Sequence, residues 1–322
     1  MCDRIICPRL TLDKQERIAY VLENTLAWSK SKHIIELVNI FDGDAEAHIN
    51  SDKGYIDWLH EFVKVWDYRL KQSGGGERWT IYDDDFILKN EEKIMVNASC
   101  LGLVEVTDVK FEPDYILPLG GARQTNLDRP KMAKYIIDKN SWKGKKIIAL
   151  SGRRPINEIE RPVVKEYAPD AVTEFDAINV GLEISFEIGK SYKDDIIDHT
   201  NINLSSCLRK YNERYRDSSI FSLAAPSSEP EKRRANSYDT FVYFLEKFNV
   251  ERGSKLLLVT SSIYVPFQLL KFIDLAVEFD LEVDCIGTDS VNERSKFSRP
   301  SNYLQEIKST VDAIHSLWNR YA

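Results

Sequence analysis

The chain has 322 residues, 43% of them hydrophobic and 30% charged, as in soluble globular proteins of one large or two ordinary domains. Its formal net charge of -7 argues against a general nucleic-acid binder, because such proteins usually carry a basic excess. No apolar run reaches the roughly 18 residues that span a bilayer, and the N-terminus has no apolar signal-peptide core. We therefore expect a cytoplasmic protein with neither a membrane nor a nucleic-acid partner.

Residues 11 to about 105 are predicted to be helical. Apolar side chains recur at spacings of three and four over 12–28 and 55–70, and a third long helix is predicted over 84–103. Thr11 and Asp13 are suitable N-cap residues for the first helix, and a glycine-rich break starts after residue 73. We expect residues 1–108 to form a helical region packed on the rest of the chain.

From residue 109 onward, short β-rich runs alternate with helical stretches. The expected strands are 115–119, 146–150, 219–223, 255–260 and 282–286. The expected helices are 129–139, 173–188, 237–249, 266–279 and 302–318. This alternation predicts an α/β domain over 109–322, a Rossmann-like three-layer fold with a mostly parallel sheet. The polar segment at about 189–235 is interpreted as an insertion or lid, with a solvated helix over 209–217.

Two expected strands end in small residues followed by arginine. One junction reads Leu119-Gly120-Gly121-Ala122-Arg123, and the other reads Ser151-Gly152-Arg153-Arg154. Glycines at strand ends let backbone N–H groups approach an anionic ligand, and the arginines add positive charge. The expected anion-binding residues are therefore Gly120, Gly121, Ser151 and Gly152 through the backbone, and Arg123, Arg129, Arg153 and Arg154 through side chains. The alternative is an ordinary turn with surface arginines.

Neither junction is a dinucleotide-binding GxGxxG fingerprint or a phosphate-binding GK[ST] loop. If the helix after the first junction starts near Asp128 and Pro130, Asp128 is a natural N-cap, and the helix N-terminus adds positive charge to the site.

Three acidic residues near the second junction are candidates for a general acid or base: Glu158, Glu160 and Glu174. Glu158 and Glu160 could instead simply neutralise the two arginines. Thr173 and Asp176 fit a capping box, which leaves Glu174 less easily explained as structural. The five cysteines are scattered and odd in number, which suits a reducing compartment, and no spacing of ligands predicts a metal site.

Two further junctions carry polar residues. Asn236 and Ser237 stand where a helix is expected to begin, and the N-cap role of Ser237 is as good an explanation as ligand binding. The strand 255–260 is followed by hydroxyl groups that could hold the polar end of a ligand: Thr260, Ser261, Ser262 and Tyr264.

The order of these four junctions resembles the YdcF/SanA/ElyC-like family. The matching segments are Leu119-Gly120-Gly121 with Arg129, Ser151-Gly152 with Glu158 or Glu160, Asn236–Thr240, and Val259-Thr260-Ser261 followed by Pro266. The resemblance implies a Rossmann-like domain with its site at the strand carboxyl ends. The chain departs from the family pattern at Tyr264, where a histidine is usual, and at Phe267, where an arginine is usual.

The leading functional hypothesis is an enzyme, a transferase or hydrolase, that acts on a small anionic or nucleotide-like metabolite. The alternative is a non-catalytic module that binds a nucleoside or an S-adenosylmethionine-like ligand, and a third is a scaffold whose helical region docks a partner. The cofactor and the oligomeric state stay open.

Overall fold

A computed structural model describes residues 4–7, 9–73, 80–288 and 299–322. The chain forms two compact units. The first, here called the helical unit, comprises Met1–Val106, Ser262–Glu278 and Val291–Ala322. The second, the sheet unit, comprises Thr107–Ser261 and Phe279–Ser290. The glycine-rich break expected after residue 73 lies outside the described residues.

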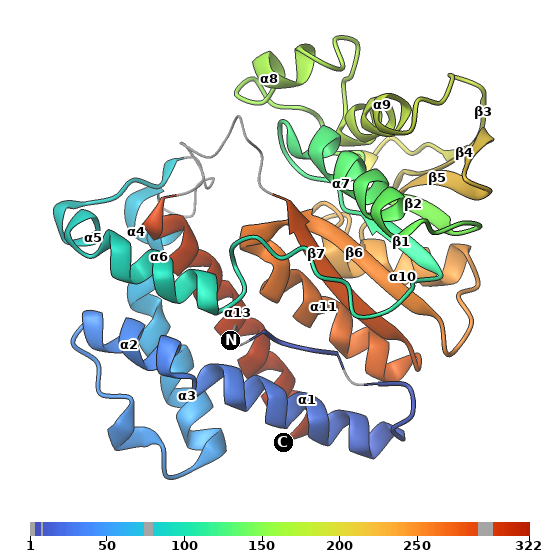
Figure 1. Ribbon diagram of the computed structural model, residues 1–322. Helices are drawn as coiled ribbons and strands as arrows, with labels where there is room; N and C mark the ends of the chain where they lie inside the picture. The colour runs from blue at the N-terminus through green and yellow to red at the C-terminus, as the bar shows by residue number, and fades with distance from the viewer. Residues whose placement is uncertain (1–3, 8, 74–79, 289–298) are drawn as a thin grey trace. The chain divides into compact units, whose positions relative to one another are not determined.

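The helical unit consists of helices drawn from both ends of the chain (Figure 1). Its described elements are α1 (Lys14–Ser29), α2 (Lys32–Ile40), η1 (Glu46–His48), α3 (Asp52–Phe62), η2 (Val63–Trp66), α4 (Tyr68–Ser73), α5 (Asp85–Lys89), α6 (Glu91–Cys100), η5 (Ser262–Tyr264), α11 (Val265–Glu278) and α13 (Pro300–Tyr321). Helix α13 packs against α1, α3, α6 and α11, so the last helix of the chain is central to this unit.

Local sequence explains where these helices begin. Asp13 caps α1 in a reciprocal capping box with Glu16, as expected, and Ser31 and Ser51 cap α2 and α3. The helix predicted over 55–70 is interrupted near Asp67, whose side chain accepts a hydrogen bond from the Leu70 N–H at 3.0 Å. The sequence prediction of one continuous helix there is therefore wrong.

The sheet unit contains one seven-stranded sheet in the order β3-β4-β5-β2-β1-β6-β7. Its strands are β1 (Tyr115–Pro118), β2 (Lys146–Ser151), β3 (Tyr192–Ile197), β4 (Ser206–Tyr215), β5 (Ser218–Ala224), β6 (Lys255–Ser261) and β7 (Glu282–Thr288). Its helices are α7 (Thr125–Asn140), α8 (Arg161–Lys165), α9 (Glu174–Phe186) and α10 (Ser237–Lys247), with a short η4 turn (Ile202–Leu204). All strands except β4 point the same way, so the predicted mostly parallel α/β sheet is confirmed.

Helices cover both faces of the parallel strands. Strand residues such as Ile116 and Ile147 share an apolar cluster with α7 and α9. The strand residues that point the other way meet α10, where the Tyr115 ring packs edge-on against Phe244. The all-apolar runs in the sequence arise because both faces of each central strand are buried.

Helices α7 and α9 lie side by side on the sheet (Figure 1). A Cβ atom at Gly181 of α9 would lie 1.9 Å from the carbonyl oxygen of Asn126 in α7. Pro130 has no N–H to bond that carbonyl within α7, so the oxygen is free to face the bare backbone of α9. Asp128 and Pro130 lie inside α7 and Gln124 is its N-cap, which corrects the predicted helix start.

The segment 189–235, predicted as an insertion or lid, supplies β3, β4 and β5 of the sheet. The solvated helix predicted over 209–217 is wrong, since most of that segment belongs to β4. Tyr211 is buried on one face of β4, while Arg209 forms a bidentate ion pair with Asp194 of β3 at 2.8 Å. These polar residues form cross-strand pairs, a pattern that local composition does not separate from a charged helix.

Candidate functional site

The carboxyl ends of the parallel strands meet at one edge of the sheet unit, where most of the predicted site residues lie. Arg129 of α7 is 4% exposed and joins two of these ends. Its Nη1 donates to the carbonyls of Leu119 at 2.8 Å and Gly120 at 2.5 Å, and its Nη2 donates to Ser261 Oγ at 3.2 Å. The predicted anion-binding arginine thus holds the ends of β1 and β6.

The two glycines of the first junction are required by close packing, whereas a Cβ at Gly152 of the second junction would meet no atom nearer than 3.9 Å. A Cβ at Gly120 would lie 2.4 Å from Glu174 Oε1, and a Cβ at Gly121 would lie 2.6 Å from Thr125 Oγ1. Their N–H groups are engaged: Gly120 donates to the Leu150 carbonyl at 2.5 Å, and Gly121 donates to Asn126 Oδ1 at 3.0 Å. The backbone donors that the sequence offers to an anion therefore bind protein acceptors in this structure.

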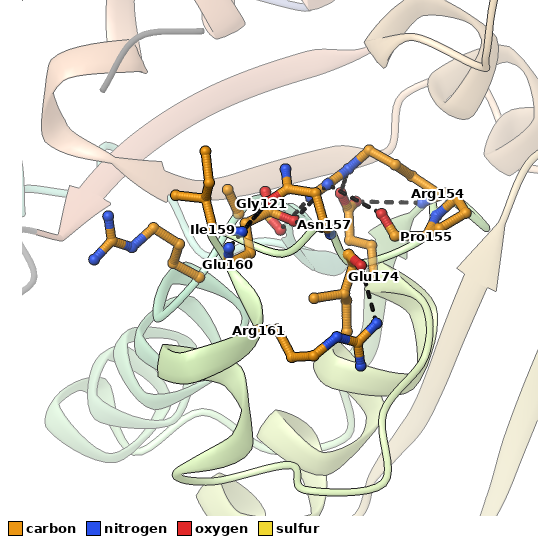
Figure 2. A network of polar contacts seen from close by, with 12 residues as sticks. Gly121, Arg154, Pro155, Asn157, Ile159, Glu160, Arg161 and Glu174 are labelled. Atoms are coloured by element: carbon orange, nitrogen blue, oxygen red, sulfur yellow. Dashed lines mark hydrogen bonds and ion pairs between the residues drawn. The ribbon is translucent and has the colours of Figure 1, made fainter. Parts of the chain in front are cut away.

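Glu174, Arg154 and Glu160 form a charged network at this edge, drawn in Figure 2 and here called the strand-end triad. Arg154 Nε donates to Glu174 Oε2 at 3.1 Å, and Arg154 Nη1 donates to Glu160 Oε2 at 2.6 Å. The side chain of Glu160 is 2% exposed, and those of Arg154 and Glu174 are 14% and 13% exposed. Glu174 Oε1 also accepts a hydrogen bond from the Gly152 N–H at 3.3 Å.

Burial changes the proton affinities of the triad. Desolvation raises the pKa of Glu174 above 4.5, although Arg154, the Gly152 N–H and Arg234 act in the opposite direction. Desolvation alone would lower the pKa of Arg154, but Glu174 and Glu160 outweigh it and raise that pKa. The triad therefore combines a permanent cation with a carboxyl group that is easier to protonate than usual.

The acidic candidates separate into two environments. Glu160 and Glu174 converge on Arg154, whereas the Glu158 side chain is 91% exposed and only approaches Arg161, at 3.8 Å. Glu160 lies directly before α8, where Asn157 Oδ1 accepts a hydrogen bond from the Glu160 N–H at 2.9 Å.

The other predicted arginines have different surroundings. Arg153 forms an ion pair with Asp198, which follows β3. Arg123 adopts a left-handed backbone with φ of 55°, and its carbonyl accepts a hydrogen bond from the Tyr167 hydroxyl at 2.8 Å. Burial raises the pKa of Tyr167 above its ordinary value. Sequence reasoning missed Asp198 and Tyr167, and only recognition of β3 could have pointed to Asp198.

Asn236, not Ser237, is the N-cap of α10 and forms a capping box with Asp239. Arg233 Nη1 donates to Asp239 Oδ2 at 2.5 Å. Burial acts to raise the pKa of Asp239, but the bonds from Arg233, Ser228 and the Asn236 N–H lower it to about 2. These contacts fix the start of α10.

The hydroxyl groups predicted at the end of β6 are divided between the units. Thr260 and Ser261 lie in the sheet unit, where Thr260 is buried and Ser261 Oγ accepts a hydrogen bond from Arg129 Nη2 at 3.2 Å. Ser151, at the end of β2, is also buried, and its Oγ donates to the Leu223 carbonyl at 3.3 Å. Ser262 and Tyr264 form part of η5 in the helical unit. Two of the four predicted hydroxyl residues thus belong to each unit.

The described residues contain neither a cluster of metal ligands nor a membrane-spanning helix. Within residues 4–7, 9–73, 80–288 and 299–322, no group of three or more His, Cys, Asp or Glu side chains could hold a metal ion. No helix in the described part of the chain is long and apolar enough to cross a membrane.

Comparison with known proteins gives a different relationship from the one the motifs suggested. Residues 13–102 match the family model of the Rv3785 N-terminal domain. The chain is 28% identical to uncharacterized protein Rv3785 of Mycobacterium tuberculosis strain H37Rv and to uncharacterized protein Mb3814 of Mycobacterium bovis. Both alignments cover 98% of this chain and 95% of the relative. No solved structure matches significantly.

The resemblance to the YdcF/SanA/ElyC-like family is therefore wrong: the matches are to Rv3785 proteins. Its motifs are short, and this structure gives them a local cause. Gly120 and Gly121 are small because Glu174 and Thr125 lie against them. Glycines at the ends of parallel strands arise from such packing in unrelated proteins.

Proposed function

We propose that the sheet unit is an enzyme, a transferase or hydrolase, that binds a small anionic or nucleotide-like metabolite beside the strand-end triad. Glu174 acts as its general acid or base. The observation that carries the proposal is a buried carboxyl group with a raised pKa, held by Arg154 at the carboxyl ends of parallel strands. A cytoplasmic location is part of the same proposal.

The order of the strands supports this location. Strand β1 lies between β2 and β6, and the chain continues from β1 to β2 but from β6 to β7. In open α/β sheets, ligands bind outside the carboxyl ends of neighbouring strands whose connections leave in opposite directions. Gly120 after β1 and Ser261 at the end of β6 mark this position. We propose on this basis that the fold is of the Rossmann-like type.

Arg234 offers the ligand a positive charge at the surface, whereas Arg154 and Arg129 are bound to protein acceptors. Arg234 is an exposed residue, and its charge opposes the larger effect of desolvation on the pKa of Glu174, so that charge acts on the triad from the solvent side. Arg154 and Arg129 are engaged with protein acceptors. We therefore expect Arg234 to meet the anionic group of the ligand.

A non-catalytic binding protein for a nucleoside or an S-adenosylmethionine-like ligand is the second candidate. The observation that favours it is the hydrogen bonding of the triad: each oxygen of Glu174 already accepts a bond from the protein. A paired carboxylate of this kind can serve structure alone.

The two candidates differ in their response to one isosteric change. Thermal unfolding is measured with inorganic phosphate, AMP, ATP and S-adenosylmethionine, and turnover of every stabilising compound is followed by NMR. For an enzyme, Glu174→Gln keeps the thermal shift and lowers turnover by about 100-fold or more, because general acid–base catalysis contributes about that much.

Glu158→Gln is the matched control, because that side chain is almost fully exposed, and it retains both binding and turnover. Undiminished turnover in Glu174→Gln contradicts its catalytic role. Thermal stabilisation without any turnover in the parent protein favours the binding protein.

A further inference from the structure

Strand β3 is an edge strand whose side chains are exposed on both faces. Among the described residues it has one strand neighbour, β4. Tyr192, Ile196 and Ile197 are 38%, 49% and 45% exposed. An exposed edge with apolar side chains is a template for pairing with another strand.

The hydrogen bonding of β3 fixes which of its backbone groups face outward. The Asn212 N–H donates to the Ser191 carbonyl at 2.9 Å, so these two residues form a hydrogen-bonded pair. Such pairs alternate along an antiparallel ladder. The N–H and C=O groups of Tyr192, Asp194 and Ile196 therefore point away from β4.

The charges of β3 favour one register for the pairing of this strand with β3 of a second copy of the chain. If Asp194 lies on a two-fold axis, Tyr192 faces Ile196 of a second copy, and all outward-pointing backbone groups meet one another. In this register Lys193 faces Asp195 of the second copy, twice by symmetry. A register shifted by two residues in one direction places Lys193 opposite Lys193 of the second copy, which is repulsive. A shift in the other direction places Asp195 opposite Asp195 of the second copy, which is also repulsive, because the ion pair of Asp195 with Lys247 of its own chain is long, at 3.9 Å.

Asp194 does not disfavour the two-fold register, although it would face its own symmetry mate. Arg209 holds both of its carboxylate oxygens at 2.8 Å. The Arg209 guanidinium also stacks 3.4 Å from the centre of the Tyr192 ring, which keeps that ring on the same face as Ile196. Each protomer thus neutralises its own Asp194.

We propose that β3 is a homodimer interface, in which two copies of this chain pair their β3 strands antiparallel around Asp194 and join their sheets. This pairing occupies the β3 edge of the sheet in both copies, so no third copy can add at that edge and the assembly closes at two subunits. Apolar pairs between Tyr192 and Ile196 lie on one face, and ion pairs between Lys193 and Asp195 lie on the other.

Light scattering coupled to size-exclusion chromatography tests the interface. The parent protein is expected at twice its chain mass of 37.2 kDa. Asp195→Lys is expected to be monomeric, because it sets lysine against Lys193, and the swap Lys193→Asp/Asp195→Lys is expected to restore the dimer. Asp170→Lys, at an exposed residue outside β3, is the control and stays dimeric. A monomeric parent, a dimeric Asp195→Lys variant or a monomeric charge swap overturns the proposal.

Disulfide trapping tests the register even if Asp195→Lys does not fold. Side chains of pairs that are not hydrogen-bonded to each other lie close enough for a disulfide. The double variant Lys193→Cys/Asp195→Cys is therefore expected to form a covalent dimer on oxidation. Lys193→Cys alone is expected to form no more covalent dimer on oxidation than the parent protein, because in this register its new thiol faces Asp195 of the second copy. Equal cross-linking of the single and double variants, or none in the double variant, contradicts the register.

Discussion

At the scale of single residues, Glu174 determines what the strand-end triad can do. Its carboxyl group is near-buried, and the atoms around it are set by three separate segments: the end of β1, the end of β2 and the first turn of α9. Arg154 compensates part of the cost of burying its charge. The balance leaves a carboxyl group whose protonation state responds to pH above the ordinary carboxyl range.

The raised pKa of Glu174 predicts how stability depends on pH. Above 4.5 the unfolded chain releases this proton before the folded chain does, so the contribution of Glu174 to the free energy of unfolding falls as pH rises. Glu174→Gln cannot titrate, so its stability relative to the parent protein is expected to increase with pH across that range. Urea unfolding at a series of pH values measures this difference. A difference that decreases with pH would show that Arg154 holds the pKa below 4.5.

Substitution of Gly120 tests the close packing against the triad. In Gly120→Ala the new methyl group meets Glu174 Oε1 at 2.4 Å and Ser151 Cβ at 2.8 Å, and we expect a loss of about 1–3 kcal/mol in the free energy of unfolding. Gly152→Ala is the control, because the nearest atom to its added Cβ is 3.9 Å away. Equal denaturant midpoints for the two variants would contradict the packing described around Glu174.

At the scale of elements, the start of α10 depends on Asn236. Asn236→Ala removes the side-chain acceptor of the Asp239 N–H and is expected to cost about 1 kcal/mol. Ser237→Ala is expected to change stability by less than half of that, since Ser237 is the first residue of the helix and not its cap. Denaturant unfolding of the two variants compares them directly, and a larger loss in Ser237→Ala would reverse the assignment.

The sequence predicted the central strands because a strand buried on both faces is apolar throughout, as in β1 and β6. It did not predict β3 and β4, whose charged residues pair across the hairpin instead of facing solvent along a helix. For the same reason it missed Asp198, the partner of Arg153, which follows β3. The sequence also did not predict that Glu160 and Glu174 both contact Arg154. That contact depends on the path of the chain that places the start of α8 and the start of α9 beside the end of β2.

At the scale of the whole molecule, the chain builds its two units from interleaved segments. Both α11 and α13 follow strands of the sheet unit in sequence and belong to the helical unit. Sequence periodicity identified these helices but gave no sign of which unit they join, since that depends on contacts between distant segments. The residues proposed for function, in contrast, all lie within the sheet unit.

The central claim is that ligand binding occurs at the carboxyl edge of the sheet, beside Glu174. Hydrogen–deuterium exchange of the full chain tests it most directly, measured with and without whichever of phosphate, AMP, ATP or S-adenosylmethionine stabilises the protein most. The account predicts slower exchange on binding in residues 119–124, 151–161 and 233–240. Protection confined to helices of the helical unit, or no protection with any of these compounds, would contradict it.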